Sequence, residues 1–365
     1  MDGKTPLVSV AMVVCNVERF LAEAIESILN QTFRDFEFII VDFGSSDASP
    51  AVVKSYQAKD DRIQFHVIPP CNLSEARNDC CFRARGKYLA LMDADDVALP
   101  DRLARQVEYL ESHPEIGILG GTNDLIDESG RWLGTAARAE NDREIRKTLL
   151  NGNPFSGNTA TMRLDAFRGV GGYRRAFADT GEDYDLSQRI MERCQGAKLG
   201  EVFARYRLHS GQISARKLRQ LSLAQCVARA SGRIRHQGKA DPVDSADSIT
   251  PELLSELGVS EEDVENTLLA TYSTRVLNSL RASAGDSTLP LVNEMLKALA
   301  QSKHVRGSVA AETWFTAARA YYRRGDIRRA CGAMTKAAIV HPSFVAATPW
   351  RGLRRAARRV TQPSG

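Results

Sequence analysis

The chain has 365 residues, which is enough for two or three domains, and its formal net charge of +4 is too small to indicate nucleic-acid binding. It contains no uninterrupted apolar segment of membrane-spanning length, and residues 1–6 do not have the pattern of a signal peptide. Its seven cysteines are scattered without Cys-x-x-Cys spacing, which argues against a disulfide framework and against a zinc site. These features predict a cytoplasmic protein.

Short apolar runs alternate with amphipathic segments through the first hundred residues. The runs expected to form buried strands cover 7–14, 36–41, 63–67 and 88–92. The helices expected between them cover 17–31, a stretch that begins at Ser49, and 74–84, with Ser74 as its cap. A helix over 100–112, a strand over 116–121 and a helix from Glu182 to about 195 are expected further on. Alternation at this spacing predicts βαβ units and an α/β fold with parallel strands.

Three carboxylates, Asp93, Asp95 and Asp96, follow the apolar run at 88–92. At the end of a buried strand they repel one another and resist desolvation, so a cation is expected among them. Carboxylate oxygens at this spacing suit Mg²⁺ or Mn²⁺ shared with phosphate oxygens, and ligand sites in open parallel sheets lie at this end of the strands. The alternative is a solvated acidic turn before the helix at 100–112.

Acidic residues also occur on two other loops. Asp42 follows the strand at 36–41, and the loops after the second and fourth strands are expected to form two walls of one nucleotide pocket. Asp183 lies in the first turn of a helix, where acidic residues are common because they interact favourably with the helix dipole. As a functional group, Asp183 can instead remove a proton from an acceptor hydroxyl.

Three further polar residues belong with these loops. Arg77 and Asn78 lie on the helix before the aspartate-rich strand and can reach phosphate oxygens, and His209 can serve as a late metal ligand or a phosphate donor. Together the loops describe displacement of a nucleoside diphosphate from an activated sugar. A metal would stabilise the charge on the leaving group, and a carboxylate would activate the attacking hydroxyl.

The C-terminal third is expected to be a separate helical region. Residues 236–250 are polar and contain proline and glycine, which predicts a linker or exposed loop. A helix is expected to start at Thr250, and Ser260 with Asp263 resembles a capping box. Residues 311–344 fit the tetratricopeptide spacing, with a generic helical hairpin as the alternative because no second repeat of equal quality is found. The expected divisions are 1–220, 221–250, 251–345 and 346–365.

The tail after Asp326 contains no acidic residue and carries five arginines between 351 and 359, beside Trp350 and Leu353. A basic segment with an aromatic edge can lie on an anionic membrane surface, which predicts peripheral contact with the inner membrane face. The alternative is a disordered, solvated chain end.

A series of short motifs resembles the family 2 glycosyltransferases, and the resemblance covers roughly residues 5–215. The motifs occur in the family's order: residues 6–10, 16–18, 31–33 and 36–42, Ala-Arg-Asn at 76–78, Met-Asp-Ala-Asp-Asp at 92–96 with Pro100, Gly-Gly-Tyr at 171–173, Glu-Asp-Tyr-Asp-Leu at 182–186, and Tyr-Arg-x-His at 206–209. The resemblance implies a GT-A fold, a nucleotide-sugar donor, a divalent metal and inversion at the anomeric carbon. The implied acceptor is a glycan or a lipid-linked molecule, and the implied process is synthesis of cell-surface polysaccharide or glycoconjugate.

The resemblance assigns roles by position. Asp93 and Asp95 become the DxD pair, and Asp183 becomes the general base. We accordingly predict a donor-binding set of Asn16, Glu18, Asp42, Arg77, Asn78, Asp93 and Ala94. The metal, Mn²⁺ or Mg²⁺, is predicted to be held by Asp95, Asp93 and His209.

One position departs from the family pattern. The family usually has a second aspartate after Asp42, where this chain has Phe43, which cannot accept a hydrogen bond from a base but can stack on one. Uridine, guanosine and deoxythymidine donors therefore all stay open. A second hypothesis is a non-catalytic scaffold that acts through its helical region. A nucleotidyltransferase is a third, but residues 9–20 lack the glycine-rich, basic phosphate loop that it needs.

Overall fold

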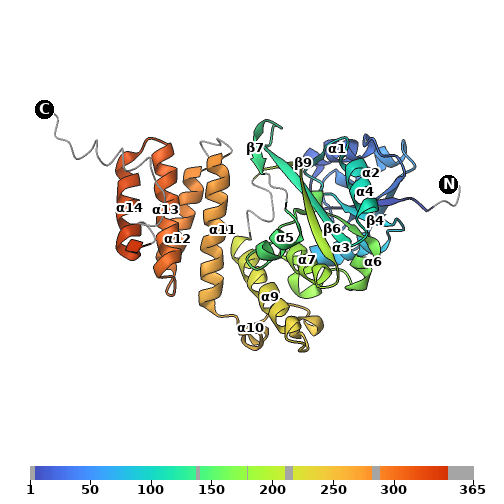
Figure 1. Ribbon diagram of the computed structural model, residues 1–365. Helices are drawn as coiled ribbons and strands as arrows, with labels where there is room; N and C mark the ends of the chain where they lie inside the picture. The colour runs from blue at the N-terminus through green and yellow to red at the C-terminus, as the bar shows by residue number, and fades with distance from the viewer. Residues whose placement is uncertain (1–4, 137–139, 179, 210–216, 282–287, 344–365) are drawn as a thin grey trace. The chain divides into compact units, whose positions relative to one another are not determined.

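The computed structural model describes residues 5–136, 140–178, 180–209, 217–281 and 288–343. The chain divides into two compact units, Met1–Gly258 and Val259–Gly365 (Figure 1). Each unit has its own cluster of buried apolar side chains. Within the described residues, no helix combines the length and the apolar character needed to cross a membrane.

The first unit is built on one mixed sheet of nine strands. The strands are β1 Val8–Val14, β2 Phe36–Asp42, β3 Ile63–Val67, β4 Tyr88–Leu91, β5 Val97–Ala98, β6 Ile116–Ile126, β7 Trp132–Ala136, β8 Thr161–Arg163 and β9 Gln195–Arg207. Their order is β3-β2-β1-β4-β8-β6-β9-β5, and β7 pairs with β6. β1 pairs in parallel with β2 and with β4, whereas β8 is antiparallel to both of its neighbours. The expected α/β fold is confirmed.

Helices pack with this sheet. They are α1 Glu18–Leu29, α2 Ser49–Gln57, α3 Leu73–Phe82, α4 Arg102–Ser112, α5 Asp142–Leu149, α6 Leu164–Gly169, α7 Glu182–Met191, α9 Leu218–His236 and α10 Pro251–Leu257. Helices α1 to α4 alternate with the strands of the sheet in the order that the sequence predicts for βαβ units, whereas α5 and α6 were not predicted. The cap of α3 is Asn72 and not Ser74. The Asn72 side chain accepts a hydrogen bond from the Glu75 amide, and Glu75 bonds back to the Asn72 amide, whereas Ser74 is buried within the first turn.

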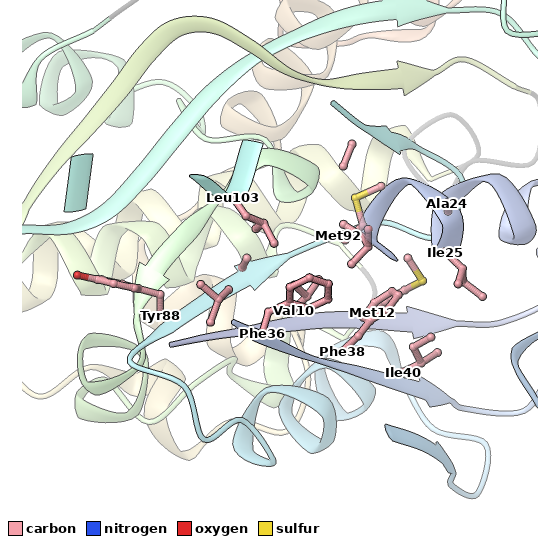
Figure 2. Packing of buried hydrophobic residues seen from close by; sticks show 14 of the residues in the cluster. Val10, Met12, Ala24, Ile25, Phe36, Phe38, Ile40, Tyr88, Met92 and Leu103 are labelled. Carbon is pink, nitrogen blue, oxygen red and sulfur yellow. The ribbon is translucent and has the colours of Figure 1, made fainter. Parts of the chain in front are cut away.

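The core explains why the first strands read as continuous apolar runs. Side chains of β1 and β2 pack against α1 and against residues of β4 and α4, as Figure 2 shows for Met12, Phe38, Ile25, Met92 and Leu103. Since strands buried on both faces have no polar side, β1 and β2 were recognisable from sequence. β1 lies between β2 and β4, so the loops after β2 and β4 flank its carboxyl end.

Strand β9 was not predicted. The sequence suggested that a helix ends near residue 195, but residues 195–207 form a strand that pairs in parallel with β6 and antiparallel with β5. Its sequence, Gln-Gly-Ala-Lys-Leu-Gly-Glu-Val-Phe-Ala-Arg-Tyr-Arg, has no regular apolar alternation, and three register shifts interrupt its pairing with β6. Its end carries Arg207 to the aspartate-rich loop after β4.

Part of the predicted linker at 236–250 is instead anchored in the first unit. Asp241 is buried and accepts hydrogen bonds from Arg174 Nη1 and Arg235 Nη1 at 2.7 and 2.6 Å. Arg174 also pairs with Asp185, a fully buried carboxylate in the first turn of α7. The polar composition of 236–250 therefore reflects a buried ion-pair network that joins this segment to α7.

This network gives a stability prediction. Arg174→Ala leaves Asp185 paired with Arg189 and Asp241 paired with Arg235, but it removes the cation that joins the two buried carboxylates. We therefore expect the free energy of unfolding to fall by about 2–3 kcal/mol. Urea denaturation measures this loss. The matched control is Arg175→Ala, the neighbouring exposed arginine, which should change the unfolding free energy by less than ~0.5 kcal/mol. Equal denaturation midpoints for the two variants would contradict the role of Arg174.

The second unit is helical, with α11 Glu261–Arg281, α12 Thr288–Gln301, α13 Gly307–Arg323 and α14 Ile327–Val340 (Figure 1). Ser260 and Asp263 form the expected reciprocal cap at the start of α11. α13 and α14 pack through small side chains, among them Ala317, Ala320, Ala330 and Ala333. α10 was expected with this region, but it belongs to the first unit, where it packs on α9 and on the 3-10 helix Pro242–Ser245. The predicted membrane-binding tail lies outside the described residues.

Candidate active site

The aspartate-rich loop after β4 holds three carboxylates in different surroundings. Asp96 is buried and accepts hydrogen bonds from Asn158 Nδ2 at 2.6 Å and from the Arg207 amide at 2.8 Å. Burial, together with the charges of Asp95 and Asp93, raises the pKa of Asp96 well above its usual range. Asp96 therefore joins this loop to the end of β9, and Asp93 and Asp95 are the carboxylates that remain partly exposed.

Asp95 lies beside His209, which follows β9. The distance from His209 Nε2 to Asp95 Oδ2 is 2.8 Å. Arg207 Nε donates to the Asp95 carbonyl at 2.9 Å, and the His209 ring packs against Phe20 with 5.0 Å between ring centroids. The unpredicted strand β9 thus brings the histidine to the carboxylate, so two of the three residues predicted to hold a metal lie side by side.

Arg77 on α3 joins the aspartate-rich loop to the start of α7. Its Nη2 lies 3.3 Å from Asp93 Oδ1, and its Nη1 pairs with Asp183 Oδ1 and lies 3.2 Å from Glu182 Oε1. Burial raises the pKa of Asp93 to about 6 and the pKa of Glu182 to about 7, although Arg77 opposes both shifts. One arginine therefore holds together carboxylates from two loops that are distant in sequence.

Gly157 lies beside both Asp183 and Asp93. A Cβ atom added to this glycine would lie 3.1 Å from Asp183 Oδ2 and 3.4 Å from Asp93 Oδ2. The two carboxylates therefore approach the same small residue, and they lie within the span of one sugar diphosphate. No local sequence pattern singles out Gly157, or Asn158 beside it.

Asp42 ends β2 on the other side of β1. Its Oδ1 accepts hydrogen bonds from the amides of Gly44 and Ser45, whereas its buried Oδ2 has no hydrogen-bond partner among the described residues. A buried carboxylate oxygen without a donor is costly, so a ligand N–H or O–H is the natural partner at this position.

Asn16 and Glu18 support the loop after β2. Asn16 Oδ1 accepts from the Ser46 amide at 2.8 Å, and Glu18 Oε2 accepts from the Ala48 amide at 2.7 Å. Asn16 has a φ of 52°, a left-handed conformation that asparagine tolerates better than most residues. Both side chains therefore hold the predicted nucleotide loop in place in this structure.

Two other predicted donor ligands are engaged with protein. The side chain of Asn78 makes two hydrogen bonds with the backbone of Tyr173: its Nδ2 donates to the carbonyl at 2.7 Å, and its Oδ1 accepts from the backbone N–H at 2.8 Å. Asn78 therefore fixes the turn at 171–173. The side chain of Ala94 is buried in the core beneath its loop. Among the described residues, no group of three or more His, Cys, Asp or Glu side chains is arranged to hold a metal ion. Of the three predicted metal ligands, Asp95 and His209 are in direct contact.

Comparison with known proteins identifies relatives of the first unit. The family model "Glycosyl transferase family 2" matches residues 9–171. EpsE of Bacillus subtilis (strain 168) is 35% identical over 216 residues, which are 58% of this chain and 76% of EpsE. The O-antigen biosynthesis glycosyltransferase WbnJ of Escherichia coli is 32% identical over 208 residues, which are 56% of this chain and 80% of WbnJ. The amylovoran biosynthesis glycosyltransferase AmsE of Erwinia amylovora is 29% identical over 202 residues, which are 54% of this chain and 74% of AmsE.

Among solved structures, the mannosyltransferase PcManGT of Pyrobaculum calidifontis, in complex with GDP-Man and Mn²⁺, has a similar fold. The TM-score is 0.50 at 19% sequence identity, and the alignment covers 92% of this chain and 87% of that one. The predicted GT-A fold is confirmed at this level.

Proposed function

Because the chain belongs to glycosyl transferase family 2, we propose that it transfers a sugar from a nucleotide-sugar donor to a hydroxyl group, with inversion at the anomeric carbon. The observation that carries this proposal is the bridge by Arg77, which brings Asp93 and Asp183 to one place. The names of WbnJ and AmsE support a role in polysaccharide biosynthesis, with a glycan or lipid-linked acceptor.

The nucleoside is proposed to bind beside β1, against the loop after β2. The unpartnered Oδ2 of Asp42 would accept a hydrogen bond from the ribose or the base, and the neighbouring Phe43 offers an aromatic ring. Asn16 and Glu18 would act by holding this loop in its binding conformation.

The donor set near the aspartate-rich loop fits a hard divalent metal. Asp95 offers a carboxylate oxygen and His209 an imidazole nitrogen 2.8 Å from it, and both are ligands that Mn²⁺ accepts. Asp93 is the third proposed ligand, and Mn²⁺ in the PcManGT complex supports metal use in this fold. When bound, such a metal would neutralise negative charge on the departing diphosphate.

Asp183 is the proposed general base. It lies at the start of α7 and, like Asp93, beside Gly157, so an acceptor hydroxyl near the donor sugar would be within its reach. Its Oδ1 is paired with Arg77, whereas its Oδ2 lies next to Gly157. The Oδ2 atom is therefore the one that would accept the proton.

Arg77 is proposed to change partners when the donor binds. It faces three carboxylates in this structure, and a diphosphate beside Asp93 would attract the same guanidinium by bidentate hydrogen bonds. Arg77 would then stabilise the leaving group and release Asp183, so that the base becomes available only after the donor is bound. This order predicts that donor binds before acceptor.

Replacing Arg77 tests this role. We expect Arg77→Gln to lower kcat/KM for the donor by at least about 30-fold, because truncating a buried charge partner costs ~2 kcal/mol or more. Initial rates with both substrates varied measure the loss. The matched control is Arg83→Gln, a partly exposed arginine just after α3 that pairs with Asp79, and it should retain wild-type kinetics. Unchanged kcat/KM in Arg77→Gln would remove Arg77 from the mechanism.

A panel of uridine, guanosine and deoxythymidine diphosphate sugars, each tested for hydrolysis and transfer with Mn²⁺ or Mg²⁺, tests the proposed function. We expect one nucleotide class to be turned over. If none is bound or turned over with either metal, the scaffold hypothesis replaces this one.

The remaining parts of the domain organisation are also proposals. The hairpin of α13 and α14 fits one tetratricopeptide-like unit in its spacing and in its contacts between small residues, and it would offer a surface for a partner. We propose that the first unit, which includes the segment predicted as a connector and α10, transfers the sugar, and that the second unit assists it. The basic tail at 346–365 is proposed to contact the inner membrane face from the cytoplasm.

A further inference from the structure

A cavity lined by residues other than those of the candidate active site lies between α5, α7 and α9 in the first unit. Its volume is about 330 Å³, which is within the range of ligand-binding pockets. Leu149, Leu150 and Met191 supply apolar surface to it. Leu150 is 70% exposed, so an apolar side chain stands at the opening instead of being covered by protein.

Cationic side chains border the same cavity. Arg229, Arg233 and His236 are spaced i, i+4 and i+7 on α9, which places them along one side of that helix. Arg146 of α5 also lines the space, but it is paired with Asp142, so the α9 side chains are the source of positive charge. The one acidic lining residue, Glu192, is already bound by Arg235 through both of its carboxylate oxygens, at 2.7 to 3.0 Å. The border therefore presents positive charge to a ligand.

An apolar interior with a positive border is complementary to a molecule that has an apolar chain and an anionic head. We propose that this cavity binds an anionic membrane lipid, with its phosphate between Arg233 and His236 and its acyl chain over Leu149, Leu150 and Met191. Among the described lining residues there is no Phe, Tyr or Trp to stack on a nucleotide base, and the surface beside the cationic side chains is aliphatic, which favours a lipid over a second nucleotide.

The cavity is joined to the helix that carries Asp183. The Tyr184 hydroxyl donates to the carbonyl of Leu149, and Met191 lies eight residues after Asp183, or about 12 Å along α7. A lipid bound here would hold α7 close to a membrane surface. This inference does not depend on sugar transfer, because lipid binding is measured without turnover.

The test is co-sedimentation of the full chain with vesicles of phosphatidylcholine alone or with phosphatidylglycerol. We expect sedimentation with the anionic vesicles, and an affinity loss of about tenfold or more in Arg233→Glu/His236→Glu. Leu150→Ser should also weaken binding. The matched control is Lys239→Glu, an exposed lysine three residues after His236 that does not line the cavity, and it should bind within about twofold of wild type. Thermal unfolding confirms that each variant is folded.

Two further arms separate the cavity from other sources of binding. Replacing the five tail arginines at 351–359 by glutamine in the full chain should leave a measurable preference for anionic vesicles, and the cavity variants should remove that preference. Soluble dihexanoylphosphatidylglycerol should raise the Tm of the wild type more than dihexanoylphosphatidylcholine or inorganic phosphate at equal ionic strength. The proposal is overturned if the wild type does not bind anionic vesicles, or if the tail variant alone loses all binding. It is also overturned if Lys239→Glu loses as much affinity as the double variant, or if inorganic phosphate raises the Tm as much as the soluble anionic lipid does.

Discussion

Asp183→Asn is expected to abolish sugar transfer and to preserve donor binding. Asparagine has nearly the same shape as aspartate, but its amide cannot accept a proton from an acceptor hydroxyl, so kcat should fall by about 10² to 10⁴-fold, the usual contribution of a general base. Donor affinity should not fall, because Asp183 is not itself a proposed donor ligand and its partner Arg77 is proposed to leave it when the donor binds. Stopped assays of transfer, with calorimetry of donor binding, measure both quantities.

A matched control for this change is Asp142→Asn, which makes the same substitution in the first turn of another helix, α5. Asp142 pairs with Arg146 away from the candidate active site, so its variant should keep the wild-type kcat. If Asp183→Asn transferred sugar at the native rate, Asp183 would not be the base. If it lost donor binding as well, its role would be to hold Arg77 and Asp93.

Asp95→Ala is expected to remove metal-dependent activity. Asp95 Oδ2 is the proposed ligand closest to His209, so its loss leaves the imidazole without its carboxylate partner and weakens metal affinity. Since a metal contributes several kcal/mol to stabilising charge on a leaving group, kcat/KM should fall by roughly 10³-fold. Activity measured across a Mn²⁺ titration should show no recovery at concentrations that saturate the wild type.

The matched control is Asp79→Ala, which removes a carboxylate of α3 that pairs with the partly exposed Arg83. It should respond to Mn²⁺ as the wild type does. Wild-type activity and an unchanged Mn²⁺ response in Asp95→Ala would show that this residue does not hold a metal required for transfer.

The parts of the fold that position the site were largely predictable from local sequence. β1 and β2 are buried on both faces, so their residues form continuous apolar runs. β4 follows the same pattern and ends within one residue of the expected position. These strands place Asp42 and Asp93 on either side of β1. Asp183 was assigned to the same site from the order of the family motifs.

Other features depend on contacts that no local pattern contains. β9 has mixed polarity and is held by pairing with β6, about 80 residues earlier in the chain. The burial of Asp241 follows from its ion pair with Arg174, 67 residues before it. Arg77 was predicted to reach phosphate, but its bridge to Asp183 spans 106 residues and appears only in the folded chain. Gly157 is part of the site because it lies beside the carboxylates of Asp183 and Asp93, which are distant from it in sequence.

The central claim is that side chains from distant loops form one metal-dependent donor site. Calorimetric titration of UDP, GDP and dTDP into the wild-type chain, with Mn²⁺ and with a chelator, tests it most directly. We expect one nucleoside diphosphate to bind in the presence of Mn²⁺ and to lose its affinity when the metal is removed. Binding of none of the three with Mn²⁺, or binding that is equally strong with the chelator, would contradict the claim.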